Sequence, residues 1–131
     1  MDKKIKILMV SSEAAPIVKV GGLGDVVGSL PSALARLGCE TRIIIPFSRG
    51  VDRKKYRLKK IKSNLKVNFS GKDFAVNIWQ TNSAVPGAVV YLVENYHYLK
   101  DMKEYIDFLL NVKSVILELV IGAIQKSLLR L

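Results

Sequence analysis

Apolar positions near the N-terminus follow the order expected of a strand, a helix and a second strand. Residues 5–11 (IKILMVS) are nearly all apolar and lack a two-residue alternation, which is typical of a strand buried on both faces in a parallel sheet. Apolar side chains then recur at helical spacing over residues 26–37, and Gly38 follows as a suitable C-terminal cap. Pro31 interrupts this helix, so we expect it to kink or restart there. Residues 41–47 (TRIIIPF) predict a second buried strand.

This strand–helix–strand unit points to an α/β fold with a Rossmann-like parallel sheet. The loop after the first strand lies at the carboxyl end of that strand, which is the edge where open α/β sheets bind ligands. Farther along, residues 65–69 and 74–81 alternate around a turn and predict a hairpin, and residues 88–94 predict another strand. From Tyr105 onward the apolar spacing is helical again.

Composition narrows the class of protein. The chain of 131 residues is the size of one domain, and half of its residues are hydrophobic. A single cysteine, Cys39, excludes an internal disulfide and suits a reducing compartment, and one histidine leaves no Cys/His cluster for zinc. The first apolar run is too short for a signal peptide, and no stretch reaches the roughly 18 apolar residues that span a bilayer. We therefore expect a cytoplasmic protein with no metal and no membrane partner.

Positive charge is concentrated in one segment. The net charge is +10, and residues 49–66 hold nine Lys/Arg against the single acid Asp52. Such a run is typical of a solvated, mobile surface connection. The alternative is a polyanion-binding surface, which predicts DNA affinity that falls steeply with salt. No nucleic-acid-binding motif accompanies the run, so no specific nucleic-acid partner is expected.

A glycine-rich loop leads into the first predicted helix. Residues 21–28 (GGLGDVVG) contain four glycines, and Lys19 stands just before them. Glycines at a helix start let backbone N–H groups approach a phosphate, and the helix dipole and a lysine add attraction, so a nucleotide diphosphate is a plausible ligand. The P-loop pattern is absent, and the dinucleotide fingerprint fails because its third glycine position is Val27. The other interpretation is that the glycines only turn the chain and let the helix pack close to the sheet.

The segment SSEAAPIVKVGGLGDVVGSLPSALARLG, residues 11–38, resembles the N-terminal signature of bacterial glycogen synthases and plant starch synthases of the ADP-glucose type. The matching elements are S-S-E-x-x-P at residues 11–16, K-x-G-G-L at residues 19–23 and D-V-V-G-x-L-P at residues 25–31, followed by a strand that ends in proline. The similarity weakens after Phe47 and returns in VVYLVENYHYL, which resembles a strand and an aromatic loop near the acceptor side of these enzymes.

The resemblance implies a GT-B fold, in which two Rossmann-like domains face each other across a cleft. It implies transfer of glucosyl units from ADP-glucose to the non-reducing end of an α-1,4-glucan in glycogen biosynthesis, with retention of the anomeric configuration and no cofactor. By the same resemblance Lys19 contacts the sugar nucleotide, and Gly21 and Gly22 keep the backbone open beside it. Further candidate substrate contacts are Leu23, Asp25 and His97. Asp25 fits helix-start electrostatics equally well, and His97 fits a plain surface position.

Residues 1–131 correspond in this interpretation to the incomplete N-terminal catalytic domain of a synthase. The catalytic acidic and basic residues are not identified in the chain, so we expect little or no transferase activity from it alone. The alternative is a non-catalytic nucleotide- or glucan-binding fragment. The oligomeric state is left open.

Overall fold

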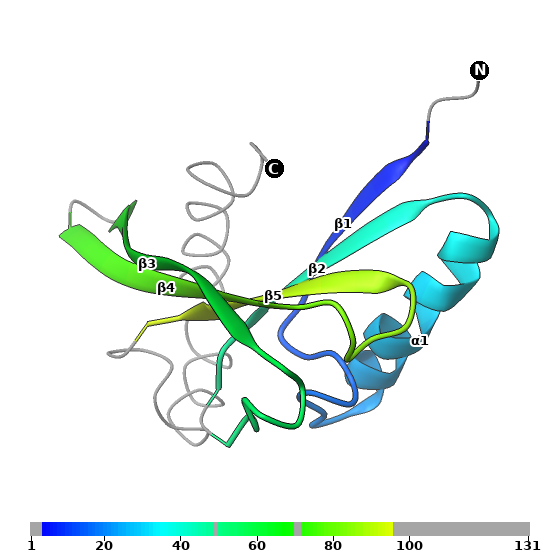
Figure 1. The fold of residues 1–131 in the computed structure, drawn as a ribbon, viewed down its shortest axis with the longest axis horizontal. Coiled ribbons are helices and arrows are strands. Elements are labelled where there is room, and N and C mark those ends of the chain that lie inside the picture. The colour runs from blue at the N-terminus through cyan, green and yellow to red at the C-terminus, as the bar shows by residue number, and fades with distance from the viewer. Residues whose placement is uncertain (1–3, 49, 70–71, 96–131) are drawn as a thin grey trace.

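The computed structural model describes residues 4–48, 50–69 and 72–95. His97 and the predicted helix from Tyr105 onward lie outside these residues. In the described part, five strands form one mixed sheet in the order β1-β2-β5-β4-β3, and one helix packs beside β2 (Figure 1). The elements are β1 (Lys6–Val10), α1 (Gly22–Arg36), β2 (Glu40–Pro46), β3 (Lys59–Phe69), β4 (Lys72–Thr81) and β5 (Ala88–Glu94).

The sheet combines a parallel part with an antiparallel part. β1, β2 and β5 run parallel, whereas β4 and β3 continue the sheet in antiparallel pairing. The α/β fold with a Rossmann-like parallel sheet is thus confirmed for β1, α1, β2 and β5, and the predicted hairpin is β3 and β4. The strand predicted for residues 88–94 is β5.

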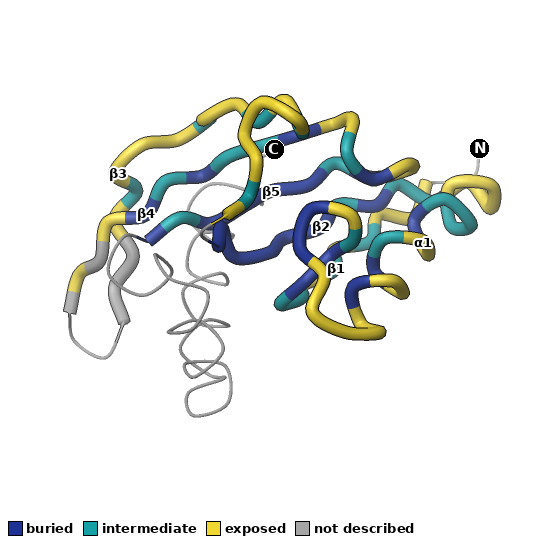
Figure 2. The backbone as a smooth tube through the Cα atoms, turned by 90° about the horizontal axis from the view of Figure 1, so that it is seen from below, coloured by how far each residue is buried: buried dark blue, intermediate teal, exposed yellow. Residues whose placement is uncertain are grey.

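The buried core is centred on the two inner strands, β2 and β5. Ile43, Ile45, Val90 and Leu92 are fully buried on these strands and pack with residues of the loop after β1 and of α1. Figure 2 shows the same arrangement, with burial running along β2 and β5 and exposure along β3 and the outer side of α1. No helix among the described residues is long and apolar enough to cross a membrane.

The prediction that the first strand is buried on both faces is wrong. β1 pairs only with β2 in the described part of the chain, and its burial alternates along the strand. Leu8 and Val10 are 42% and 40% exposed. An apolar run fixes a strand but not its place in the sheet, and here the run lies at an edge.

Helix α1 continues through Pro31 without a restart. Pro31 is buried, and its carbonyl lies beside the turn at Gly87, where an added Cβ would come within 2.7 Å of the Pro31 oxygen. The turn at Gly87 thus packs closely against α1 at Pro31, and the helix continues although the proline has no N–H to donate. At its C-terminal end α1 stops at Arg36, and Gly38 adopts a φ of 85°, which confirms the predicted cap.

The basic segment is more ordered than the sequence pattern suggested. β3 begins at Lys59, so the lysines from Lys59 to Lys66 belong to an edge strand rather than to a mobile connection. Arg53 is held as well, because its guanidinium pairs with Glu94 at 3.1 Å and lies 4.6 Å from the centroid of the Trp79 ring. Lysines on an edge strand are a common protection against pairing with another sheet.

Candidate functional site

The loop between β1 and α1 folds back on itself at the carboxyl end of β1. The Ser11 amide donates to the Ile44 carbonyl and so extends the parallel ladder by one residue. Ala14 and Val18 then exchange two backbone hydrogen bonds of 3.0 Å, which closes a small turn and buries both side chains with Ile17. The rest of the loop, residues 19–21, then leads directly into the start of α1.

The carboxylate of Glu13 organises this loop from the inside. Glu13 is only 6% exposed, and its two oxygens accept hydrogen bonds from the backbone amides of Val20, Gly21 and Gly24. The distance from the Gly24 nitrogen to Oε1 is 2.8 Å, and the Gly21 nitrogen lies 3.2 Å and 3.3 Å from the two oxygens. Both oxygens of the side chain therefore act as acceptors of backbone N–H groups.

These hydrogen bonds reduce the number of backbone amides that are available for the predicted phosphate site. Three amides of the loop that could have bound a ligand, those of Val20 and of the glycines 21 and 24, already donate to Glu13. The amides of Gly22 and Leu23, in the first turn of α1, donate to no group in the described ranges. The amides still available to an anion are therefore those at the exposed start of α1, where the helix dipole is strongest.

The glycines of the loop fall into two kinds. An added Cβ at Gly28 would overlap the carbonyl oxygen of Ala15, and one at Gly24 would lie 3.3 Å from the Val18 oxygen. At Gly22, by contrast, it would meet nothing within 4 Å, and at Gly21 only a Glu13 oxygen at 3.9 Å. Close helix packing therefore accounts for Gly24 and Gly28, but it does not account for Gly21 and Gly22.

Lys19 and Asp25 lie on the exposed rim of the loop. The Lys19 ammonium is 3.0 Å from Asp25 Oδ2, and the two side chains are 55% and 58% exposed. Asp25 stands in the first turn of α1, where a carboxylate is favoured by the helix dipole. Leu23 is exposed beside them. The structure thus brings together five of the six predicted site residues, namely Lys19, Gly21, Gly22, Leu23 and Asp25, and His97 lies outside the described residues.

Glu13 is the site residue that sequence reasoning missed. The S-S-E-x-x-P element contained it, but a glutamate eleven residues before its partner Gly24 carries no spacing signal of its own. Among the described residues, no group of three or more His, Cys, Asp or Glu side chains could hold a metal ion.

A second charged cluster lies around Glu94 at the carboxyl end of β5, and its polar side chains bond to one another. The Glu94 carboxylate accepts hydrogen bonds from Trp79 Nε1 at 3.1 Å and from Asn77 Nδ2 at 2.9 Å, and it pairs with Arg53. These contacts fasten the basic segment to β4 and β5.

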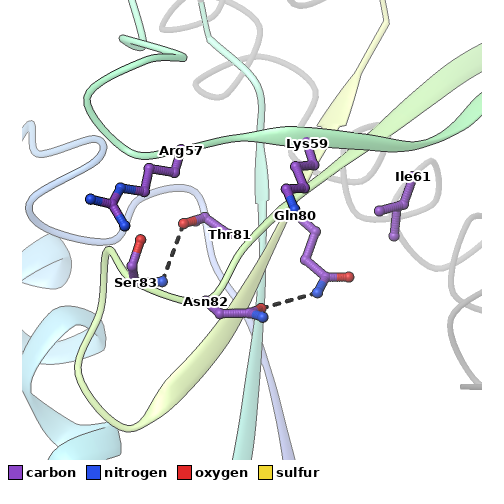
Figure 3. Close-up of a pocket in the computed structure, with 7 residues that line it drawn as sticks. All are labelled: Arg57, Lys59, Ile61, Gln80, Thr81, Asn82 and Ser83. Atoms are coloured by element: carbon purple, nitrogen blue, oxygen red, sulfur yellow. Dashed lines mark hydrogen bonds between the residues drawn. The ribbon is translucent and has the colours of Figure 1, made fainter.

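A shallow cavity of about 200 Å³ lies between the start of β3 and the end of β4 (Figure 3). The Thr81 hydroxyl inside it accepts from the Ser83 amide, and Gln80 donates to the side chain of Asn82. None of the predicted site residues lines it; the lining residues are Arg57, Lys59, Ile61, Gln80, Thr81, Asn82 and Ser83.

Comparison with protein families gives a match over most of the chain. Residues 6–117 match the model of the starch synthase catalytic domain. The chain is 41% identical over 100 residues to glycogen synthase 1 of Geobacter metallireducens, and 42% identical over 101 residues to the glycogen synthase of Moorella thermoacetica. These alignments cover 73% and 75% of this chain but only 19% of each relative.

A solved structure has a similar fold. The catalytic domain of starch synthase IV from Arabidopsis thaliana, determined with ADP and acarbose bound, superimposes with a TM-score of 0.64 and 32% sequence identity. The match covers 72% of this chain and 19% of that one. The chain therefore spans about a fifth of the length of the proteins that it matches.

Proposed function

The chain belongs to the family of starch synthase catalytic domains, and on that premise we propose that it supplies the donor-side loop of a glycogen synthase. The reaction is the transfer of a glucosyl unit from ADP-glucose to the non-reducing end of an α-1,4-glucan, with retention of configuration. The proposed partners are ADP-glucose and the α-1,4-glucan, and the proposed location is the cytoplasm. The second domain of a GT-B enzyme would close the cleft from the other side.

One observation supports this proposal above the others. Gly21 and Gly22 leave the backbone uncovered, although neither their backbone angles nor the packing around them requires glycine. Next to them lie the exposed ammonium of Lys19 and two amides, of Gly22 and Leu23, that donate to no group in the described part of the chain. A bare backbone, helix-start amides and a lysine together form a surface suited to a sugar diphosphate.

The ion pair with Asp25 suits Lys19 to this role. An exposed pair of this kind contributes about 0–1 kcal/mol to stability, so it is easily exchanged for a stronger one. A diphosphate carries more negative charge than one carboxylate and can take over the ammonium. Asp25 then serves to hold Lys19 at the rim before the donor arrives.

The chemistry assigned to this loop is electrostatic. When the bond between the glucosyl carbon and the diphosphate breaks, negative charge grows on the leaving ADP. Lys19 and the amides of Gly22 and Leu23 are fixed in advance near that charge, which is the arrangement by which enzymes stabilise a developing anion. The loop also orients the glucosyl unit against the bare glycines.

Calorimetric titration of the chain with ADP-glucose tests the proposal. We expect Lys19→Ala to weaken donor binding by at least tenfold, because it removes the only full charge assigned to the diphosphate. Lys55→Ala is the matched control, since Lys55 is an exposed lysine outside the loop, and it should leave the affinity unchanged. Equal donor affinity in Lys19→Ala and the unmodified chain would contradict the proposal.

Two further titrations distinguish the alternatives. Binding of maltooligosaccharides without any binding of ADP-glucose would favour a glucan-binding fragment instead. Glucosyl incorporation into glycogen by the 131 residues alone should be slight, because orienting donor and acceptor together requires both sides of the cleft. Turnover within tenfold of a full-length synthase would contradict that expectation.

A further inference from the structure

We infer that Glu13 is a positioning residue of the donor site: it caps α1 from the buried side of the loop, so that the exposed side stays bare for the donor. The inference rests on the proposed function, and it assigns a role to a residue that is not expected to touch the donor.

A helix start needs partners for its first amides. An α-helix leaves four N–H groups without an intrahelical acceptor, and the usual solution is an N-cap side chain whose oxygen accepts from the second or third helical residue. In α1 the N-cap residue is Gly21, which has no side chain to do this. The amide of the third helical residue, Gly24, instead donates to Glu13 at 2.8 Å.

The side from which the cap comes is the important point. Glu13 is buried and reaches the helix start from behind, through the space beneath Gly21. A Ser, Thr or Asp at position 21 would bring its own acceptor oxygen within reach of the Leu23 amide, next to the amide of Gly22. The pairing of a remote glutamate with a glycine cap thus stabilises the helix start while it leaves those two amides to a ligand.

Both carboxylate oxygens are needed for this arrangement. Oε1 accepts from Gly24 and Oε2 from Val20, while the Gly21 amide is shared between them. Glutamine has the same shape, but its NH₂ group would face one of these N–H donors and could not accept from it. Glu13→Gln therefore removes the double acceptor without creating a cavity.

The first experiment measures donor affinity and thermal stability together. Glu13→Gln should weaken ADP-glucose binding at least tenfold, and the exchange of the Val20, Gly21 and Gly24 amide hydrogens should become faster. Val76→Ala is the matched control, because Val76 is fully buried on β4 and outside the cluster that contains the loop. It should lower the Tm while leaving donor affinity within threefold of the unmodified chain, measured well below the Tm. If Glu13→Gln binds the donor as well as Val76→Ala does, the inference is overturned.

The second experiment adds a cap at position 21 itself and does not depend on tolerance of a change at Glu13. Gly21 has extended backbone angles that serine also adopts, and a Cβ there has room. Gly21→Ser should keep or raise the Tm while it weakens donor binding at least tenfold. Unchanged donor affinity in Gly21→Ser would overturn the inference. The double variant Glu13→Gln/Gly21→Ser should recover Tm relative to Glu13→Gln but not affinity, and recovery of affinity would count against the inference.

These outcomes are separable from failure of the proposed function. If the unmodified chain does not bind ADP-glucose, or if Lys19→Ala binds it equally well, the proposed function is wrong. If Lys19→Ala loses binding and Glu13→Gln does not, only the role of Glu13 is wrong.

Discussion

The glycine loop has two sides that use the same residue type for different reasons. On the inner side, Gly28 lets α1 approach the Ala15 carbonyl more closely than any side chain would permit, and an added Cβ at Gly24 would lie a tight 3.3 Å from the Val18 oxygen. On the outer side, an added Cβ would meet nothing within 4 Å at Gly22 and only a Glu13 oxygen at 3.9 Å at Gly21. The contrast teaches that a cluster of glycines in a sequence is not one signal: part of it is explained by packing, and only the remainder points to a ligand.

The largest effect on the inner side is expected from Gly28→Ala. The new Cβ would overlap the Ala15 carbonyl, so the loop or the helix must shift. Overpacking of this kind costs about 1–3 kcal/mol. Thermal denaturation should show a Tm lower by several degrees, and an unchanged Tm would mean that the inner side is not tightly packed.

Gly22→Ala makes the matching change on the outer side. The added methyl meets no neighbour, and alanine is the better helix former, so the free energy of unfolding should stay the same or rise by up to about 1 kcal/mol. Donor affinity should nevertheless fall about tenfold, equivalent to ~1.4 kcal/mol, because the methyl occupies space reserved for the ligand. Calorimetry and denaturation on the same sample check both. If Gly22→Ala binds ADP-glucose as tightly as the unmodified chain does, the distinction between the two sides of the loop is wrong.

Asp25→Asn is expected to have a smaller effect. It removes the exposed ion pair with Lys19 and one favourable charge at the helix start, and together these should lower stability by no more than about 1 kcal/mol. Donor affinity should change less than threefold, since Lys19 itself remains. A loss as large as that of Lys19→Ala would instead show that Asp25 contacts the donor directly.

The smallest effect on donor binding is expected from exposed charge outside the glycine loop. Replacing Lys54, Lys55, Lys59 and Lys60 by alanine should leave ADP-glucose affinity unchanged, because these exposed lysines lie in and before β3. The same variant tests the polyanion alternative in a salt series with DNA. Salt-sensitive DNA binding that depends on these four residues and not on Lys19 would favour that alternative.

Much of the fold could be predicted from local patterns. Residues 41–47 and 88–94 are mostly apolar, and they form the two buried inner strands β2 and β5. The hairpin followed from alternation around a turn, and the end of α1 followed from Gly38. These features depend on neighbours a few residues away in the chain, which is why the sequence pattern records them.

Other features depend on contacts between distant segments and had no local signature. β1 reads like a buried strand, yet its position at the edge of the described sheet follows from which strand it pairs with. The lysines from Lys59 onward read as a solvated connection, yet pairing with β4 makes them a strand. Pro31 predicts a kink or a restart of the helix, yet α1 is continuous through it and packs there against the turn at Gly87.

For the site, the sequence by itself determined that a lysine and a glycine cluster stand at the start of a helix behind the first strand, because motif order and helix spacing are properties of the chain. Only the tertiary structure decided how the loop amides are divided between a buried glutamate and the open surface. That division depends on the loop folding back so that Glu13 lies beneath residues 20–24, and a contact made by folding back cannot be read from spacing alone.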